Sequence, residues 1–322
     1  MTKQASTIVI GSRGSQLALW QSEWVQSALQ KRFPHLTIEI QFIKTTGDKV
    51  LDSPLSKIGD KGLFTKEIEH ALLENRIDLA VHSLKDLPTV VPDGLTIGAV
   101  TQREDVRDVF ISHPRKHYKY VSDLPQGATI ATGSLRRKCQ LLNWRPDVKI
   151  VDLRGNLNTR LAKLDASDWD GIILARAGVI RLCYEERIAE VISLEKVLPA
   201  VGQGALAIEI CEGDTHIADI VGTLTSKATM LATSGERALL RRLEGGCQIP
   251  IGAYGRIEKN VFRLDAMIGS LDGKKILRGK IHGEPEQSEA LGVELAETLL
   301  ESGGKEILDQ IHTPNIQEVP II

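Results

Sequence analysis

Residues 129–160, TIATGSLRRKCQLLNWRPDVKIVDLRGNLNTR, decide the fold of this chain because they contain one structural pattern twice. Each half starts with a short apolar run, passes through a turn with glycine, and continues into a stretch with helical spacing of apolar residues. We therefore expect strands at 129–131 and 149–153, each followed by a helix, at 135–144 and 157–164. Strands that alternate with helices predict an α/β sheet with parallel neighbours.

The same pattern occurs near the N-terminus, which predicts two lobes of this kind. A strand at 7–10 leads through the turn at 11–14 into a helix at 15–32, which ends before Pro34. Further strands are expected at 38–43, 79–81 and 172–175, and a further helix at 65–73. Because ligands of open α/β sheets bind beyond the carboxyl ends of the strands, two facing lobes predict a cleft. The alternative is two ordinary domains whose turn glycines only allow sharp bends.

The last third of the chain has a different pattern. Residues 261–270 and 275–282 flank an Asp-Gly turn and predict a β-hairpin, and 284–302 has the spacing of an amphipathic helix. We expect a small α+β domain from about residue 227, with a frayed tail at 313–322.

Length and composition limit the class of protein. A chain of 322 residues predicts two or three domains, and 42% hydrophobic with 25% charged residues is typical of a soluble globular protein. The net charge of -2 argues against a protein that coats nucleic acid non-specifically, because such a protein would be basic overall. The N-terminus shows no signal peptide or membrane span, and the four cysteines show no metal-binding spacing, so we expect no metal. A reduced setting is expected, either the cytoplasm or, after removal of a transit peptide, the plastid stroma.

Basic residues are concentrated in the second lobe. Between Ser134 and Arg160 there are seven lysines and arginines but only two acidic residues. Several of the arginines follow a turn at an expected helix start, where free N–H groups and the helix dipole favour anions. Arginine adds a planar fork that matches a carboxylate or phosphate. The pattern predicts a site for a small molecule with many negative charges.

Asp86 and Cys247 are the candidates for chemistry. Asp86 directly follows the strand at 79–81, where its carboxylate could stabilise a cation or move protons; an aspartate that opens a turn before Pro88 is the alternative. Cys247 follows two glycines on an expected loop, which favours reactivity, whereas the other cysteines are expected to be buried and inert. His82 is expected to satisfy a hydrogen bond in the core rather than to act as a base.

The segment 48–66 combines glycines with lysines. It is either a basic lid that closes over an anionic substrate or an ordinary solvated loop, and the sequence alone leaves both open.

Together these segments resemble the porphobilinogen deaminase family, also called hydroxymethylbilane synthases, over nearly the whole chain. The resemblance rests on seven ordered segments: 11–15 (GSRGS), 59–64 (GDKGLF), 82–88 (HSLKDLP), 134–137 (SLRR), 153–156 (LRGN), 198–205 (LPAVGQGA) and 243–252 (LEGGCQIPIG). It implies an α/β fold with two lobes like those of periplasmic binding proteins, with mixed, mostly parallel sheets, and a small α+β C-terminal domain. The implied domains are 1–105 with 205–222, then 106–200, then 227–322.

The resemblance also implies an activity. It is that of a transferase of tetrapyrrole biosynthesis, which condenses porphobilinogen stepwise onto an enzyme-bound dipyrromethane, releases ammonia, and finally releases hydroxymethylbilane. Cys247 would carry the dipyrromethane cofactor through a thioether, and Asp86 would be the catalytic aspartate. Carboxylate-binding residues would be Arg13, Ser15, Ser83, Lys85, Ser134, Arg136, Arg137, Arg154, Arg160 and Gln203, with Lys57 and Lys61 in the lid. The protein would be a monomer without nucleic-acid or membrane partners.

Three positions depart from the family pattern. Gly133 stands where relatives often carry a hydroxyl or methyl side chain, and Gln16 stands where proline is common. Arg176 occupies a position that is usually small or apolar, so it is either an extra anion contact or a solvent-facing residue.

Two other classes remain as alternatives. A non-catalytic anion-binding protein would share the lobes and arginines but would need neither Asp86 nor a loop cysteine. A nucleic-acid binder would use the arginines on phosphates, but only 4% of the residues are aromatic, which gives little support for base stacking.

Overall fold

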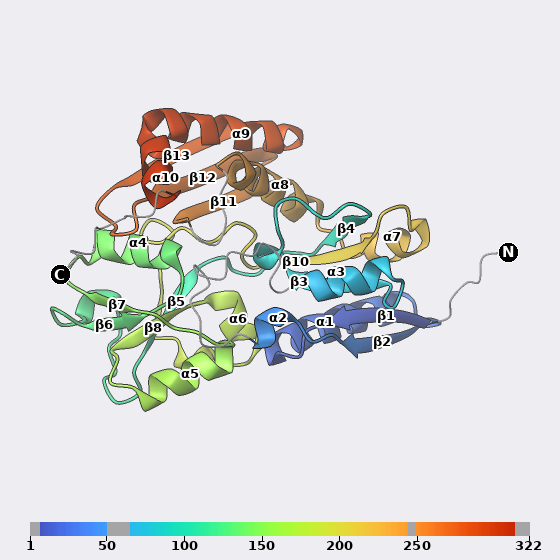
Figure 1. The fold of residues 1–322 in the computed structure, drawn as a ribbon, viewed down its shortest axis with the longest axis horizontal. Helices are drawn as coiled ribbons and strands as arrows, with labels where there is room; N and C mark the ends of the chain where they lie inside the picture. The colour runs from blue at the N-terminus through green and yellow to red at the C-terminus, as the bar shows by residue number, and fades with distance from the viewer. Residues whose placement is uncertain (1–6, 50–64, 244–248, 313–322) are drawn as a thin grey trace, which may run out of the picture.

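The computed structural model describes residues 7–49, 65–243 and 249–312, and these form three sheets with their helices (Figure 1). The first sheet and the second sheet define two lobes side by side, and the third sheet lies across them. Within the described residues, no helix is long and apolar enough to cross a membrane.

The first sheet has five strands. In spatial order these are β2 (Thr37–Phe42), β1 (Thr7–Ser12), β3 (Leu79–Ser83), β10 (Leu206–Cys211) and β4 (Leu95–Val100). The three strands β2, β1 and β3 run parallel, whereas β10 is antiparallel to both of its neighbours.

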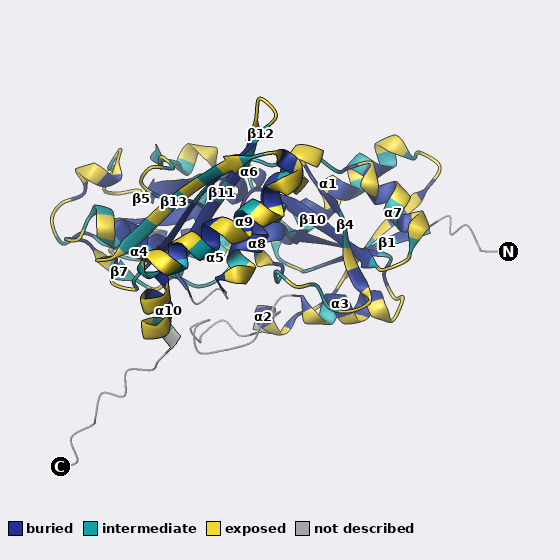
Figure 2. Cartoon of the chain, turned by 90° about the horizontal axis from the view of Figure 1, so that it is seen from above, coloured by how far each residue is buried: buried dark blue, intermediate teal, exposed yellow. Residues whose placement is uncertain are grey.

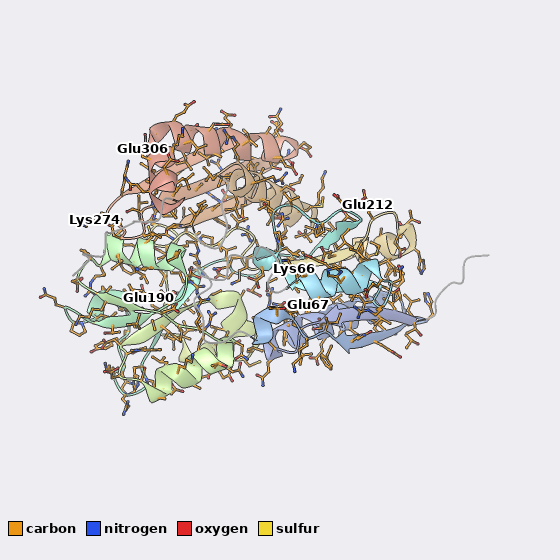
Figure 3. All side chains as sticks on the ribbon, viewed as in Figure 1. Lys66, Glu67, Glu190, Glu212, Lys274 and Glu306 are labelled. Atoms are coloured by element: carbon orange, nitrogen blue, oxygen red, sulfur yellow. The ribbon has the colours of Figure 1, made fainter. Side chains whose placement is uncertain are left out.

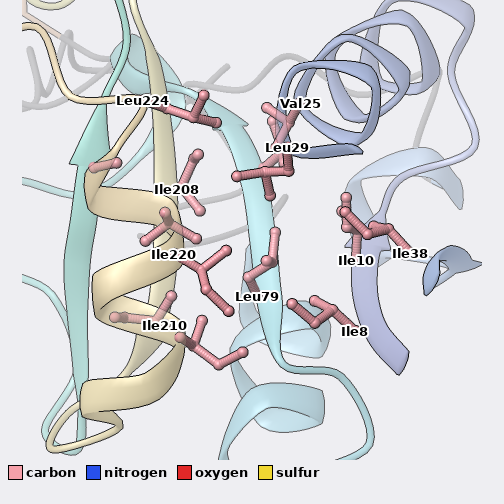
Figure 4. Close-up of a cluster of buried hydrophobic side chains, with 14 of the residues drawn as sticks. Ile8, Ile10, Val25, Leu29, Ile38, Leu79, Ile208, Ile210, Ile220 and Leu224 are labelled. Carbon is pink, nitrogen blue, oxygen red and sulfur yellow. The ribbon is translucent and has the colours of Figure 1, made fainter. Parts of the chain in front are cut away.

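Helices cover both faces of the first sheet. α1 (Gln16–Arg32) and α7 (Thr215–Gly222) pack on one face, where their apolar side chains meet those of the strands (Figure 4). α3 (Lys66–Leu73) packs on the other face. The short α2 (Thr46–Lys49) precedes it in the chain.

The second sheet repeats this plan. Its strands in spatial order are β7 (Lys149–Val151), β6 (Thr129–Ala131), β8 (Gly171–Ala175), β5 (Asp108–Ser112) and β9 (Glu190–Val191). Again three parallel strands are followed by an antiparallel strand, β5, in the fourth place. α4 (Leu135–Trp144) covers one face, and α5 (Leu157–Ala166) and α6 (Arg176–Arg181) cover the other.

The two lobes exchange strands. β5 directly follows β4 of the first sheet but pairs in the second, and β10 comes after β9 of the second sheet but pairs in the first. The chain therefore crosses between the lobes twice, and the two crossings touch. Gly204 has a φ of +93°, and a Cβ there would lie 2.5 Å from the carbonyl oxygen of Glu104. Only glycine allows this approach.

The third sheet is an antiparallel meander. β11 (Ile251–Glu258), β12 (Val261–Gly269) and β13 (Ile276–Gly283) carry the long helices α8 (Lys227–Arg242) and α9 (Ser288–Leu299), with α10 (Lys305–His312) beside them. The central strand β12 is mostly buried, whereas the helices expose their outer faces (Figure 2).

A buried carboxylate joins this third unit to both crossings. Glu236 of α8 accepts hydrogen bonds from Arg103 Nη1 at 2.6 Å, from Gly202 N at 2.7 Å and from Gly255 N at 2.6 Å. Because the three donors come from the two crossings and from β11, the third unit is fixed to the point where the lobes meet.

These observations confirm the predicted fold class of two mixed α/β lobes and a small α+β unit. The prediction that the sheets are mostly parallel is wrong. Parallel and antiparallel neighbours are equally frequent in each large sheet, because one strand of each arrives from the other lobe. The hairpin around Gly273 forms as predicted. The helix predicted at 284–302 has its α-helical part at Ser288–Leu299, after a 3-10 turn at Pro285–Gln287.

Candidate active site

A pocket lies beyond the carboxyl ends of β1 and β3, on the side of the first lobe that faces the second. Polar residues that line the pocket come from the turn after β1, from α1, from the residue before α3, and from β3 and the turn that follows it. They are Arg13, Ser15, Gln21, Thr65, His82, Ser83 and Asp86. In Figure 3 the labelled Lys66 and Glu67 mark the start of α3 on this side. Glu67 accepts a hydrogen bond from Thr46 N at 2.8 Å, which joins the starts of α2 and α3.

The turn after β1 brings the first residues to the pocket. Ser15 caps α1 by accepting a hydrogen bond from Ala18 N at 3.3 Å, and Arg13 precedes it in the turn. Gln21, one turn further along α1, donates from Nε2 to Ser83 Oγ at 2.9 Å. This bond fixes the end of β3 against α1.

Lys85 and Asp86 lie on a 3-10 turn, Leu84–Asp86, directly after β3. Asp86 is exposed and Lys85 is partly buried. Burial lowers the pKa of Lys85 to about 8, with a further lowering by Arg137 and opposition from Asp86. The pKa of Lys85 therefore depends on charged groups of both lobes.

Arg136 and Arg137 start α4 in the second lobe, and both side chains are buried. Arg136 Nη1 lies 2.8 Å from Asp108 Oδ2, and Arg137 Nη2 lies 2.8 Å from Asp108 Oδ1. The two guanidinium groups hold the pKa of Asp108 well below its usual range, although burial alone would raise it. Gln203 Nε2 donates to the same carboxylate at 2.9 Å.

The two arginines carry more positive charge than Asp108 neutralises. Two arginines share one carboxylate, and Arg137 Nε is buried without a hydrogen-bond partner among the described residues. Arg160 donates from Nε to Gly155 O at 2.8 Å. Its pKa is lowered to about 10, first by burial and then by Arg137 and Arg154, whereas Asp86 raises it.

Asp86 of the first lobe is thus within electrostatic reach of the arginine cluster of the second. The structure brings Arg13 and Asp86 into one pocket and places Arg137, Arg154 and Arg160 close enough to influence one another. The guanidinium groups that lack a counter-ion can bind an anionic molecule. The exposed carboxylate of Asp86 can then act on a cationic centre within that molecule.

Two family models match this chain. The model described as porphobilinogen deaminase, dipyromethane cofactor binding domain, matches residues 8–219, and that of the porphobilinogen deaminase C-terminal domain matches 230–301. The chain belongs to the porphobilinogen deaminase family. Curated porphobilinogen deaminases agree: that of Chloroherpeton thalassium is 52% identical, over 96% of this chain and 98% of that relative. That of Chlorobaculum parvum is 54% identical, over 94% and 97%.

Solved structures with low sequence identity also match. The methionine-binding protein MetQ matches with a TM-score of 0.45 and 13% identity, over 73% of this chain and 96% of that one.

The site fits the dipyrromethane cofactor of the family by its charge. The acidic pyrrole chain requires cationic partners, and the second lobe offers more guanidinium charge than its own carboxylates balance. Cys247, Lys57 and Lys61 lie outside the described residues, so their predicted roles have no structural description. Among the described residues no cluster of three or more His, Cys, Asp or Glu could hold a metal ion.

The prediction that the other cysteines are buried is correct for Cys139 but wrong for Cys183, which is exposed, and for Cys211, which is half-buried. Other predicted residues make specific contacts. Arg154 Nε lies 3.3 Å from Asp152 Oδ2. Ser134 caps α4 by accepting from Arg137 N at 3.5 Å, so its hydroxyl is already used locally. Arg176 does not simply face solvent, because its Nη1 lies 3.3 Å from Asp105 Oδ2 on the first crossing.

Two residues of the site were missed by the sequence reasoning. Asp108 opens β5 and is the buried partner of Arg136 and Arg137; an aspartate directly before an apolar run was the available signal. Arg181 is buried at the end of α6, donates from Nη2 to Gly204 O at 2.8 Å, and lies 5.5 Å from the ring centre of Trp20. It joins the second lobe to α1, and nothing in its local sequence indicates this.

Proposed function

We propose that this chain performs the reaction of its family with the residues described above. Porphobilinogen units are condensed one after another onto an enzyme-bound dipyrromethane, ammonia is released at each step, and the linear product hydroxymethylbilane is finally released. One observation carries the assignment: an exposed carboxylate, Asp86, shares its electrostatic environment with the arginines of the opposite lobe.

The arginines bind the carboxylates of the substrate. Porphobilinogen carries one acetate and one propionate group, so each added ring brings two negative charges. Arg13 reaches the site from the first lobe, and Arg137 and Arg160 reach it from the second. Bidentate guanidinium–carboxylate pairs hold such groups in a fixed register. Ser15, Ser83, Lys85, Ser134, Arg136, Arg154 and Gln203 complete this binding surface, and Lys57 and Lys61 act in a lid.

Asp86 acts on the reacting carbon. In its protonated form the carboxyl group gives a proton to the aminomethyl nitrogen of the substrate, which leaves as ammonia. In its ionised form it stabilises the positive charge that develops on the substrate. Its exposed position on the turn after β3 allows contact with a bound pyrrole.

Cys247 attaches the cofactor. When bound there through a thioether, the dipyrromethane supplies the free pyrrole carbon to which the first substrate is joined. The cationic cluster holds the cofactor's carboxylates, and Asp86 lies beside that cluster.

Mass spectrometry of the intact protein tests the assignment. We expect the wild type to exceed its sequence mass by two pyrrole units, the adduct to be lost in Cys247→Ser, and the matched control Cys183→Ser, at an exposed cysteine, to keep it. Purified wild type should release hydroxymethylbilane and ammonia from porphobilinogen. An unmodified wild type without turnover would instead identify a non-catalytic anion-binding protein.

The remaining expectations are part of the same proposal. We infer a cytoplasmic monomer with domains at 1–105 with 205–222, at 106–200 and at 227–322. Size-exclusion chromatography with light scattering tests the monomer, for which we expect a mass near 35.4 kDa.

A further inference from the structure

A buried acidic cluster lies behind the pocket of Asp86. His82 on β3, Glu209 on β10 and Glu69 on α3 are all buried, and the side chain of Glu209 has no exposed surface. Burial of three ionisable groups is costly unless they are paired. Since none of the three has a role in the function proposed above, their placement calls for a physical reason.

The topology brings the three groups together. In the register of β3 and β10, Ala207 pairs with His82 and Glu209 with Ala80, so His82 and Glu209 are diagonal neighbours on one face of the sheet. The distance from His82 Nε2 to Glu209 Oε2 is 3.1 Å. α3 covers this face and contributes Glu69 from its buried side.

The two ring nitrogens of His82 have different surroundings. Nε2 meets the buried carboxylate of Glu209, so Nδ1 is the ring nitrogen left for a second interaction. His82 also lines the pocket that contains Asp86 and Arg13. A carboxylate that accepts the Nε2–H fixes the neutral tautomer and leaves the lone pair on Nδ1. Such a nitrogen can accept a proton, and the residue that carries it lines the pocket.

The third member of the cluster is Glu69. Burial raises the pKa of Glu69, and the neighbouring Glu209 raises it further. The Oε1 atoms of Glu69 and Glu209 have no hydrogen-bond partner among the described residues. Other charged or titratable groups near the cluster come from each neighbouring element: Arg13 after β1, Lys85 and Asp86 after β3, His70 on α3, Cys211 on β10 and Arg237 on α8.

We propose that His82, oriented by the buried Glu209, is a second proton acceptor in the pocket of Asp86. This inference rests on the proposed function. In each condensation the C–N bond of the substrate breaks, a C–C bond forms to the free pyrrole carbon, and the hydrogen on that carbon leaves as a proton. The nitrogen, bound as a neutral amine, has taken one proton from Asp86.

The proton balance closes with two carriers. Asp86 stays ionised beside the cation while His82 Nδ1 accepts the proton from the pyrrole carbon. That proton then passes to Asp86 before the next ring, so each turn releases ammonia and restores both groups. With Asp86 alone, one carboxylate would have to stabilise the cation and remove its proton.

The variant His82→Gln separates proton transfer from structure. Its side-chain amide can still donate to Glu209, but it offers no basic nitrogen to the pocket. We expect kcat to fall by about 10²-fold, which is the size of effect typical when a general acid or base is removed. KM and the mass of the cofactor adduct should stay unchanged. Porphobilinogen with deuterium on its free pyrrole carbon should show a larger isotope effect on kcat in this variant than in the wild type.

Two carboxylate variants sharpen the test. Glu209→Gln keeps an acceptor for Nε2–H but removes the charge, so we expect a smaller loss of kcat and an altered pH profile. Glu69→Gln resembles the protonated carboxyl that burial favours and should retain near wild-type kcat. Nitrogen-15 NMR of histidine, assigned by the signal missing in His82→Gln, should show the Nε2–H tautomer near neutral pH.

The outcomes are distinguishable from a failure of the proposed function. A wild type that makes no hydroxymethylbilane overturns the proposed function itself. A wild type that turns over, with an unchanged rate and isotope effect in His82→Gln, overturns only the role of His82. The Nδ1–H tautomer at neutral pH would overturn it as well.

Discussion

The two lobes have the same sheet plan but use their fourth strand in different ways. In each lobe that strand is antiparallel and carries a wholly buried carboxylate: Glu209 on β10 in the first and Asp108 on β5 in the second. Glu209 meets a histidine, which can lose its proton, whereas Asp108 meets two arginines, which cannot. In the proposed mechanism the first lobe therefore carries protons, whereas the second supplies permanent positive charge.

The largest expected effect follows from removing the catalytic carboxylate of the first lobe. Asp86→Asn keeps the shape of the side chain and removes its charge, so we expect kcat for hydroxymethylbilane formation to fall by about 10²–10⁴-fold. An absorbance or fluorescence assay of hydroxymethylbilane formation, with the enzyme saturated with porphobilinogen, measures kcat. A variant that turns over at nearly the wild-type rate would exclude Asp86 as the catalytic group.

The second effect compares the two buried carboxylates directly. Asp108→Asn leaves Arg136 and Arg137 buried without their counter-ion, so we expect the free energy of unfolding to fall by about 3–5 kcal/mol. Glu209→Gln should cost less, because the amide oxygen can still accept the Nε2–H of His82, so no hydrogen bond is lost. Urea unfolding of both variants measures the difference, and equal losses would contradict the contrast between fixed and removable charge.

The pH dependence of substrate binding is a smaller effect. The pKa of Lys85 is lowered to about 8, so the side chain is positively charged below this pH and becomes neutral above it. KM for porphobilinogen should therefore rise as the pH increases through 8. Lys85→Arg keeps its charge and should lack this rise; a wild-type KM that is flat up to pH 9 would show that Lys85 does not bind substrate.

The smallest effect concerns a helix start in the second lobe. Ser134 caps α4 through Arg137 N, so Ser134→Ala should lower the free energy of unfolding by about 1 kcal/mol. Ser15→Ala in α1 is the matched change in the first lobe. If Ser134 also binds substrate carboxylates, its variant should in addition raise KM; a KM unchanged in steady-state kinetics would leave only the capping role.

Local patterns predicted much of the fold, because many elements are specified by nearby residues. The strand Thr129–Ala131 and the helix Leu135–Trp144 have the predicted bounds, since turns and capping residues mark their ends. The strand exchange through β5 and β10 was not derivable from such patterns. An apolar run indicates a strand but not which sheet it joins, and that choice depends on contacts distant in sequence.

The same limit applies to the site. Arginines at helix starts indicated an anion-binding surface, and motif resemblance singled out Asp86. The sequence did not show that Asp108 would bind Arg136 and Arg137, because the partners are 28 and 29 residues apart. The pairing of His82 with Glu209 spans 127 residues and was equally hidden.

Strand exchange also constrains how the chain is made. Among the described strands β4 pairs only with β10, so during synthesis it lacks this sheet neighbour until residues 206–211 leave the ribosome. A nascent chain of the first two hundred residues holds an open edge at β3 and an unpaired β4, both of which invite association with other chains. The N-terminal lobe, although translated first, is the one whose sheet must wait for its fourth strand.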